Sequence, residues 1–137
     1  MAKLNSRGII TPARPLLVDA ITPVVEALTA AGIRVTLDVK RINPPGCYLH
    51  PPELQMRWRA GDFTATHRLL VVASSKDRAQ SYQDISELID QVLIALDDAP
   101  VTLRPASVET SDVSTYLTAY DLIWTDRVRQ ITEGNQP

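Results

Sequence analysis

Hydrophobic and polar residues alternate most regularly between Phe63 and Ser74, and this pattern predicts the longest strand of the chain. The odd-numbered positions from Phe63 to Ala73 would share one face, and the even-numbered positions from Thr64 to Ser74 the other. Every position from Leu69 to Ala73 is apolar, so we expect a strand with neighbours at both edges and cover on both faces.

A helical repeat of three to four residues precedes this strand, over residues 15–32. Its apolar stripe consists of Leu17, Ile21, Val24, Leu28 and Ala31. Pro15 suits the first helical position, and Gly32 suits the left-handed residue just past the end. Pro23 predicts either a kink or a shorter helix that begins with Thr22 as its N-cap.

A second helical repeat follows the strand and extends to Asp97. Its apolar stripe consists of Ile85, Leu88, Ile89, Val92 and Leu96. Ser81 and Asp84 have the spacing of a capping-box variant, and Asp84 and Glu87 would place negative charge in the first turn. At the far end, Asp97 and Asp98 are either solvated acids or part of an acidic patch that faces a partner.

Further strands are predicted on both sides of this unit. Alternation over 33–39 predicts a half-buried strand with Ile33, Val35, Leu37 and Val39 inward. A rigid turn at 41–46 leads to a short strand at 47–50, and Pro51-Pro52 predicts an edge position or a bend there. Residues 53–59 then form a hairpin with the long strand.

A second hairpin is predicted from residues 101–109 and 115–125. Pro105 indicates that its first strand is bulged or at an edge of the sheet. In the second strand, Tyr116, Thr118, Tyr120, Leu122 and Trp124 would share one face. The element order predicts an α+β fold, with a mostly antiparallel mixed sheet of about four to six strands and two helices on one face.

The length of 137 residues predicts a single domain. We expect an ordered core at about 15–125, an N-terminal arm at 1–14 and a C-terminal tail at 126–137. The arm is either disordered or ordered against a neighbouring subunit.

Fourteen basic and sixteen acidic side chains give a net charge of −2, which argues against a protein whose main role is to bind nucleic acid backbone. The single cysteine, Cys47, fits a reducing compartment. The sequence shows no secretory leader and no apolar run of membrane-spanning length, so we expect use in a cytoplasm and no membrane.

The residues that could carry chemistry are isolated. His50, His67 and Cys47 lack companions at metal-ligand or catalytic spacing, so we expect no enzyme activity, no metal and no cofactor. We interpret His67 as a partly buried strand histidine with a hydrogen-bond partner, and Cys47 as a small buried hydrophobe. Arg57, Arg59 and Arg68 could form a nucleic-acid surface beside Phe63, but alternation separates Trp58 from the arginines of its own strand.

Several segments together resemble a known family. They are PLLVD at 15–19, PVVEAL at 23–28, AGI at 31–33, NPPGCYL at 43–49 and LIDQVL at 88–93. With this element order, the chain resembles the tail-terminator (minor tail) proteins of long-tailed bacteriophages, particularly those that infect actinobacteria. The similarity covers about residues 15–124.

The resemblance implies a structural virion protein that is assembled in the host cytoplasm. Such proteins form a homo-oligomeric ring, a hexamer, at the head-proximal end of the tail tube. The ring stops polymerisation of the major tail tube protein and presents a surface to the head-completion (connector) protein. DNA passes through the lumen without specific binding.

A closed ring needs two different patches on each subunit. Candidate patches are the long strands at 63–74 or 115–125 on one side, and the 44–46 loop or the N-terminal arm on the other. The candidate interface residues are Pro44, Pro45, Gly46, Arg57, Arg59, Ser75, Lys76 and Asp77. Two alternatives remain open: another head–tail connector or neck protein, and a small nucleic-acid- or ligand-binding module.

Overall fold

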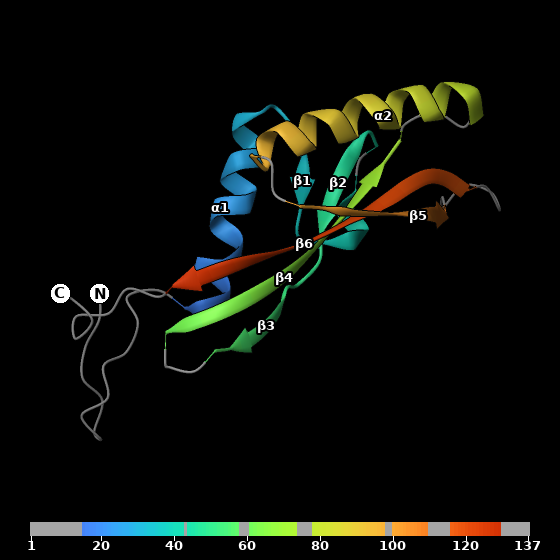
Figure 1. The fold of residues 1–137 in the computed structure, drawn as a ribbon. Coiled ribbons are helices and arrows are strands. Elements are labelled where there is room, and N and C mark those ends of the chain that lie inside the picture. The colour runs from blue at the N-terminus through green and yellow to red at the C-terminus, as the bar shows by residue number, and fades with distance from the viewer. Residues whose placement is uncertain are drawn as a thin grey trace, which may run out of the picture.

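The computed structural model describes residues 15–42, 44–57, 61–73, 78–97, 100–109 and 116–129. Within these residues the elements follow in the order α1 (Leu16–Ala30), β1 (Val35–Thr36), the 3-10 helix η1 (Val39–Arg41), β2 (Gly46–Leu49), β3 (Glu53–Met56), β4 (Asp62–Val72), α2 (Arg78–Ala95), β5 (Thr102–Glu109) and β6 (Tyr116–Arg129) (Figure 1). The six strands form one sheet in the order β1-β2-β4-β6-β5, and β3 also pairs with β4. β1 and β2 are parallel, and the other described pairs are antiparallel. The predicted α+β class is confirmed.

β4 is the central strand, as its apolar run predicts. All eleven of its residues pair with β6 at one edge. At the other edge, β2 pairs with the second half of β4 and β3 with the first half. β4 therefore has neighbours along both edges.

A bend separates β2 from β3 at the predicted proline pair. Leu49 lies opposite Leu69, whereas Glu53 lies opposite Thr66, so residues 50–52 face only two residues of β4. Pro51 and Pro52 have no backbone N–H and fall within this mismatch. The extra residue lets one chain segment follow β4 along nearly its whole length.

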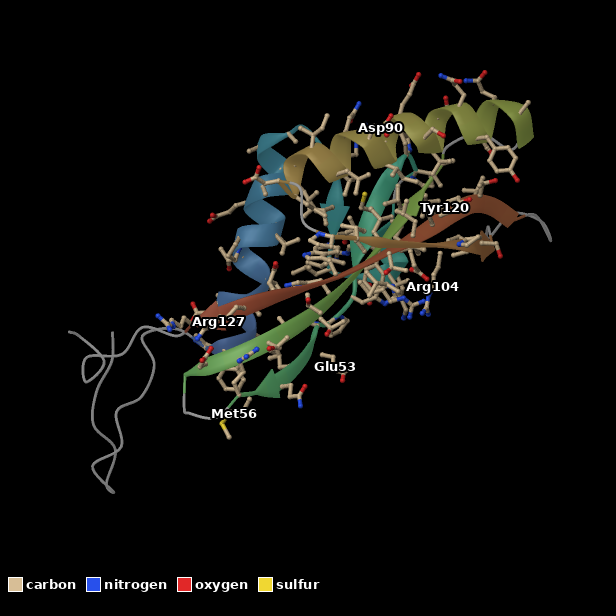
Figure 2. The ribbon with its side chains drawn as sticks, in the orientation of Figure 1. Glu53, Met56, Asp90, Arg104, Tyr120 and Arg127 are labelled. Carbon is tan, nitrogen blue, oxygen red and sulfur yellow. The ribbon has the colours of Figure 1, made fainter. Side chains whose placement is uncertain are left out.

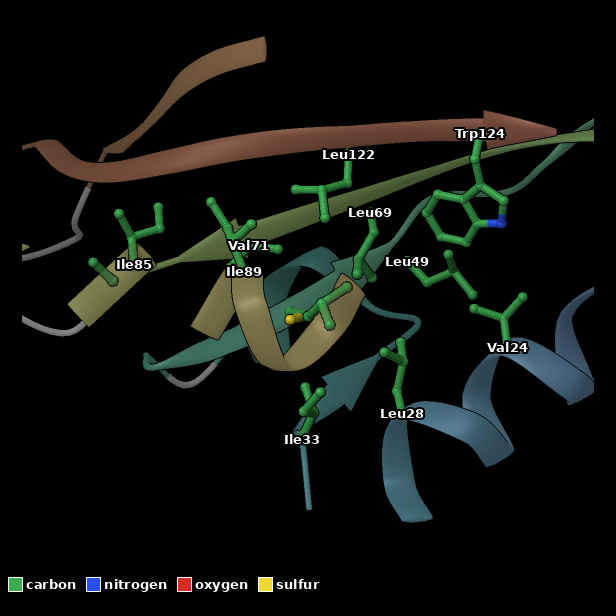
Figure 3. Close-up of a cluster of buried hydrophobic side chains, with 13 residues drawn as sticks. Val24, Leu28, Ile33, Leu49, Leu69, Val71, Ile85, Ile89, Leu122 and Trp124 are labelled. Carbon is green, nitrogen blue, oxygen red and sulfur yellow. The ribbon is translucent and has the colours of Figure 1, made fainter. Parts of the chain in front are cut away.

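The main core lies between the two helices and one face of the sheet (Figure 3). α1 contributes Val24 and Leu28, and α2 contributes Ile85, Ile89 and Val92. The sheet side of this cluster includes Cys47, Leu49, Leu69, Val71, Leu122 and Trp124. Both helices therefore cover the same face, and the predicted stripe of α2 is buried or half-buried at every position.

α1 continues without interruption through Pro23, so the alternative of a shorter helix beginning after Thr22 is wrong. At its end, Ile33 N–H donates to Leu28 O (3.0 Å) and Gly32 N–H to Thr29 O (3.0 Å). Gly32 has a φ of 78°, so these bonds form a Schellman motif with the predicted left-handed glycine.

The apolar stripe of α1 is displaced from its predicted position. Leu17 is 52% exposed and Ala31 is exposed, whereas Ala20 is buried. Ala20 packs with Ala65 and Val128 at the end of the sheet. A small residue there allows close approach of the helix, which a search for large apolar side chains does not detect.

The strand predicted at 33–39 is wrong over most of its length, because β1 contains only Val35 and Thr36. Asp38 N–H donates to Thr36 Oγ1 (3.1 Å), and Lys40 N–H donates to Asp38 Oδ1 (3.0 Å). These local side-chain bonds end the strand and begin η1. Leu37 and Val39, which were expected inward, are each 54% exposed.

Two boundaries also differ from the prediction. α2 begins at Arg78, so Ser81 is not a cap and Asp84 and Glu87 lie beyond the first turn. β6 continues to Arg129, so residues 126–129 belong to the sheet and not to a tail. Pro105 lies in β5, which is an edge strand as predicted.

Candidate interaction surface

The sheet has a second face that neither described helix covers. In antiparallel pairs, directly opposed residues point to the same side of a sheet. The even-numbered positions of β4 and the odd-numbered positions of β6 therefore share this side with their partners on β2, β3 and β5. We call this side the open face.

Arginine dominates the charged residues of the open face. Arg57 follows β3 and continues its register, because its N–H donates to Asp62 O (2.8 Å). The described arginines of this face are Arg57, Arg68, Arg104, Arg127 and Arg129, and its acids are Glu53, Asp62 and Asp121. Figure 2 shows Arg104 on the side of the sheet away from α2.

The first charged group, the Asp62 cluster, consists of Asp62, Arg57, Arg127 and Arg129. Asp62 is 1% exposed and accepts hydrogen bonds from Nε (3.0 Å) and Nη2 (2.9 Å) of Arg127. This bond is the largest cause of the lowered pKa of Asp62, and the charges of Arg127, Arg129 and Arg57 add to it. Three arginines surround one carboxylate, so the cluster keeps an excess of positive charge.

Arg57 forms the side of the Asp62 cluster next to β3. Its Nη1 donates to Thr64 Oγ1 (3.1 Å), which holds the exposed guanidinium over the sheet. A shallow hollow of about 280 Å³ lies beside it, lined by Gln55, Met56, Arg57 and Thr64. Guanidinium groups placed in this way bind carboxylates or phosphates.

The second charged group, the Asp121 cluster, consists of Asp121, Arg68, His50 and Arg104. Arg68 Nη2 donates to Asp121 Oδ2 (2.7 Å), and Asp121 is 6% exposed. His50 Nε2 lies 3.9 Å from Asp121 Oδ1, too far for a hydrogen bond, and neither atom has a partner in the described part of the chain. Arg104 lies directly opposite Asp121 on β5.

His50 is held neutral at physiological pH. Burial is the largest cause of its lowered pKa, the charge of Arg68 lowers it further, and Asp121 opposes both effects. Its ring packs against that of Tyr48, with a centroid distance of 4.5 Å. Because His50 is neutral, the charged groups of the Asp121 cluster are two arginines and one carboxylate.

The helix layer on the other side of the molecule is acidic. The sequences of α1 and α2 contain five acids, Asp19, Glu26, Asp84, Glu87 and Asp90, and one basic residue, Arg78, at the first position of α2. Glu87 and Asp90 are exposed, and Figure 2 shows Asp90 on the outer side of α2. The two sides of the molecule thus carry opposite charge.

The covered face contains a buried polar group around His67, which is 0% exposed rather than partly buried as expected. Its ring stacks on Trp124 at 5.1 Å, and its Nε2 lies 3.1 Å from Asp126 Oδ2 without good alignment for a hydrogen bond. Burial lowers the pKa of His67, against the opposing effect of Asp126. At the far end of β6, Ser81 Oγ donates to Thr118 Oγ1 (3.1 Å) and joins α2 to β6.

Cys47 lies in the same core and is 2% exposed. Burial raises the pKa of its thiol to about 12, so the nucleophilic thiolate is not populated at neutral pH. This environment agrees with the prediction of a small buried hydrophobe.

The predicted interface residues do not form one patch. Gly46 is buried opposite Val72, at one end of β4, and Pro44 and Pro45 precede it. Arg57 lies opposite Asp62, ten β4 positions away, which is roughly 33 Å. Arg59, Ser75, Lys76 and Asp77 lie outside the described residues.

Sequence reasoning placed Arg68 and Arg57 on one face, and the structure agrees. It missed Arg104, Arg127 and Arg129, which are brought to the same face by β5 and β6. The signal was present in β6, because the alternation of Leu122, Trp124 and Asp126 continues to Val128 and leaves the arginines on the other side.

In the described part of the chain, no group of three or more His, Cys, Asp or Glu side chains could hold a metal ion. None of the described helices is long and apolar enough to cross a membrane. No protein-family model matches the sequence, and a search of curated proteins also finds no match.

Proposed function

We propose that this protein is a tail terminator of a long-tailed bacteriophage. It forms a homo-oligomeric ring, a hexamer, at the head-proximal end of the tail tube and stops polymerisation of the major tail tube protein. It then presents a surface to the head-completion protein. The role is structural, in the virion, and involves no catalysis.

The observation that carries this proposal is the division of charge between the two sides of the molecule. A ring of identical subunits needs two different, complementary patches on each subunit. The arginine-rich open face and the acidic helix layer satisfy this requirement. A protein that acts through one patch has no need for both.

The fold also supports the proposal. Two helices on one face of a mostly antiparallel sheet is the architecture that the resemblance implies. Away from its end at Val72 and Ala119, where Ile42 packs on a small apolar cluster, the second face is available to a neighbour. A net charge of −2 is compatible with a lumen that lets DNA pass without holding it.

The test is tube assembly from the tail tube protein of the same phage, with and without this protein. Electron microscopy of the products gives the distribution of tube lengths. We expect shorter tubes with a cap at one end, whereas an unrelated protein of similar size and charge leaves the lengths unchanged. Tubes that grow to the same length in both reactions, with bare ends, would exclude a terminator.

A second candidate, a module that binds single-stranded nucleic acid, is favoured by one observation. The Asp62 cluster and the Tyr48–His50 ring pair share the open face, and such a face can bind phosphates and stack bases. Fluorescence anisotropy with a labelled oligonucleotide separates the candidates. Tight binding that weakens steeply with added salt supports the module, and its absence supports the ring protein.

A further inference from the structure

We infer that the open face of one copy binds the outer surface of α2 in a second copy of the same chain. This contact rests on the proposed ring and names the two surfaces that would form it. It is heterologous, because the two subunits use different surfaces, and such contacts close into a ring when the rotation between subunits allows it.

The outer surface of α2 is the acidic partner in this contact. Glu87, Asp90 and Ile94 recur at three and four residues, so they share one side of the helix, away from the stripe that packs on the sheet. Glu87 and Asp90 are exposed, and Ile94 is 80% exposed.

The two arginine groups of the open face have a spacing that suits this helix. The Asp62 cluster and the Asp121 cluster lie eight β4 positions apart, because Asp121 is opposite Leu70, and this separation is roughly 26 Å. α2 has 18 residues, which corresponds to about 27 Å along the helix axis, so the helix is long enough to lie across both arginine groups.

An apolar contact would lie beside the Asp121 cluster. Ile123 is half-buried on the open face and lies opposite Arg68, on the side of this cluster that faces Asp62. Ile94 lies on the same side of α2 as Asp90, four residues beyond it. An exposed isoleucine within a charged surface is explained if it packs on Ile123 of the neighbour.

The acids of the open face do not neutralise its arginines. Asp62 and Asp121 each bind one arginine, Arg127 and Arg68 respectively, and with Glu53 the face has three carboxylates against five arginines. Arg104 and Arg129 remain for an outside carboxylate, and both are exposed. The partner that best matches a row of exposed arginines within this molecule is the acidic side of α2.

Two complementary charge reversals test the contact. The sheet variant carries Arg104→Glu and Arg129→Glu, and the helix variant carries Glu87→Arg and Asp90→Arg. Sedimentation velocity over a series of protein concentrations measures self-association. We expect each variant alone to associate at least about tenfold more weakly than the wild type, because like charges then face each other.

The mixture of the two variants gives the decisive result. In an equimolar mixture, the unaltered arginines of the helix variant meet the unaltered α2 of the sheet variant, and the reversed surfaces also match each other. Association should therefore return to nearly the wild-type level. A contact that does not pair the open face with α2 does not predict loss of association in both single variants followed by this recovery.

Controls separate the contact from misfolding. Glu26→Arg changes an exposed acid of α1 outside the contact and should leave association unchanged. Thermal unfolding checks that each variant folds, and Arg104→Gln with Arg129→Gln should weaken association without adding negative charge beside Asp62 and Asp121. Equal association of all variants, or a mixture that stays dissociated, would overturn the inference.

The outcome is distinct from that of the tube assay. Wild-type protein that caps tubes, with no recovery in the variant mixture, leaves the proposed function standing and removes this contact. Recovery in the mixture without capping of tubes supports this contact and removes the proposed function. Loss of oligonucleotide binding in the sheet variant, with no wild-type self-association at any concentration, would instead assign the arginines to nucleic acid and overturn the inference.

Discussion

Alanine substitutions at Leu122 and Leu103 measure how much the covered face of the sheet contributes to the free energy of unfolding. They lie opposite each other on β6 and β5 and point to the same side of the sheet. Leu122 is 0% exposed among core residues of both helices, whereas Leu103 is 44% exposed at the edge strand. The same substitution to alanine should therefore have very different effects at the two positions.

The expected magnitudes follow from burial. Leucine to alanine removes three carbon atoms, and their transfer from water contributes about 2.4 kcal/mol when they are fully buried. The cavity left at Leu122 adds about 1 kcal/mol, so Leu122→Ala should lower the free energy of unfolding by about 3–4 kcal/mol. At Leu103, partial exposure and the absence of a closed cavity reduce the loss to about 1 kcal/mol.

Urea denaturation followed by circular dichroism measures both values. The slope of the free energy with denaturant should be the same in the two variants and the wild type, because the surface exposed on unfolding is nearly unchanged. The thermal midpoint should fall by roughly 10–15 °C for Leu122→Ala. Equal losses at the two positions would refute a core between the helices and β6.

Three further predictions concern single residues. Cys47, with a thiol pKa raised to about 12 by burial, should react with Ellman's reagent only after unfolding, and rapid reaction of the folded protein would contradict its placement. Because burial lowers the pKa of His67, the unfolded chain takes up a proton below about pH 6.5 before the folded chain does. The free energy of unfolding should therefore decrease between pH 7 and pH 5, and it should decrease less in His67→Gln. The same pH dependence in that variant as in the wild type would mean that a group other than His67 causes the decrease. Gly32→Ala should lower the free energy of unfolding by about 1 kcal/mol, since Gly32 has a φ of 78° and a Cβ there meets no atom within 4 Å, and a stabilised variant would exclude that backbone conformation.

Periodicity was sufficient to predict the central unit of the fold. β4 and α2 have long, regular patterns, and their buried positions agree with the predicted faces. Gly32 and Pro105 were also informative, because each restricts the backbone in a way that leaves few alternatives. The fold class follows from these elements and from the need to cover two apolar stripes.

Local hydrogen bonds explain where periodicity failed. Thr36 and Asp38 end β1 after two residues although the alternation continues, because their side chains bond to the nearby backbone. Ser81 has the spacing of a cap but bonds to Thr118 on β6, a partner that only the folded chain brings close. The Ser81–Thr118 bond joins segments that are distant in the sequence, and the Thr36 and Asp38 bonds compete with strand pairing. The alternation of apolar and polar residues shows neither.

The arginine-rich open face could be predicted only in part, because it depends on strand pairing. Arg57 and Arg68 follow from the alternation of their own hairpin, but the approach of Arg127 to Asp62 requires the register between β4 and β6. Arg104 joins the face through a third strand. A one-residue shift in either register would move these side chains to the other side of the sheet.

Electron cryo-microscopy of tail tubes assembled in the presence of this protein would show the proposed ring itself. We expect a closed ring of identical subunits at one end of the tube, in which the open face of each subunit lies against α2 of the next. Tubes without a ring, or a protein found only along bound DNA, would contradict it.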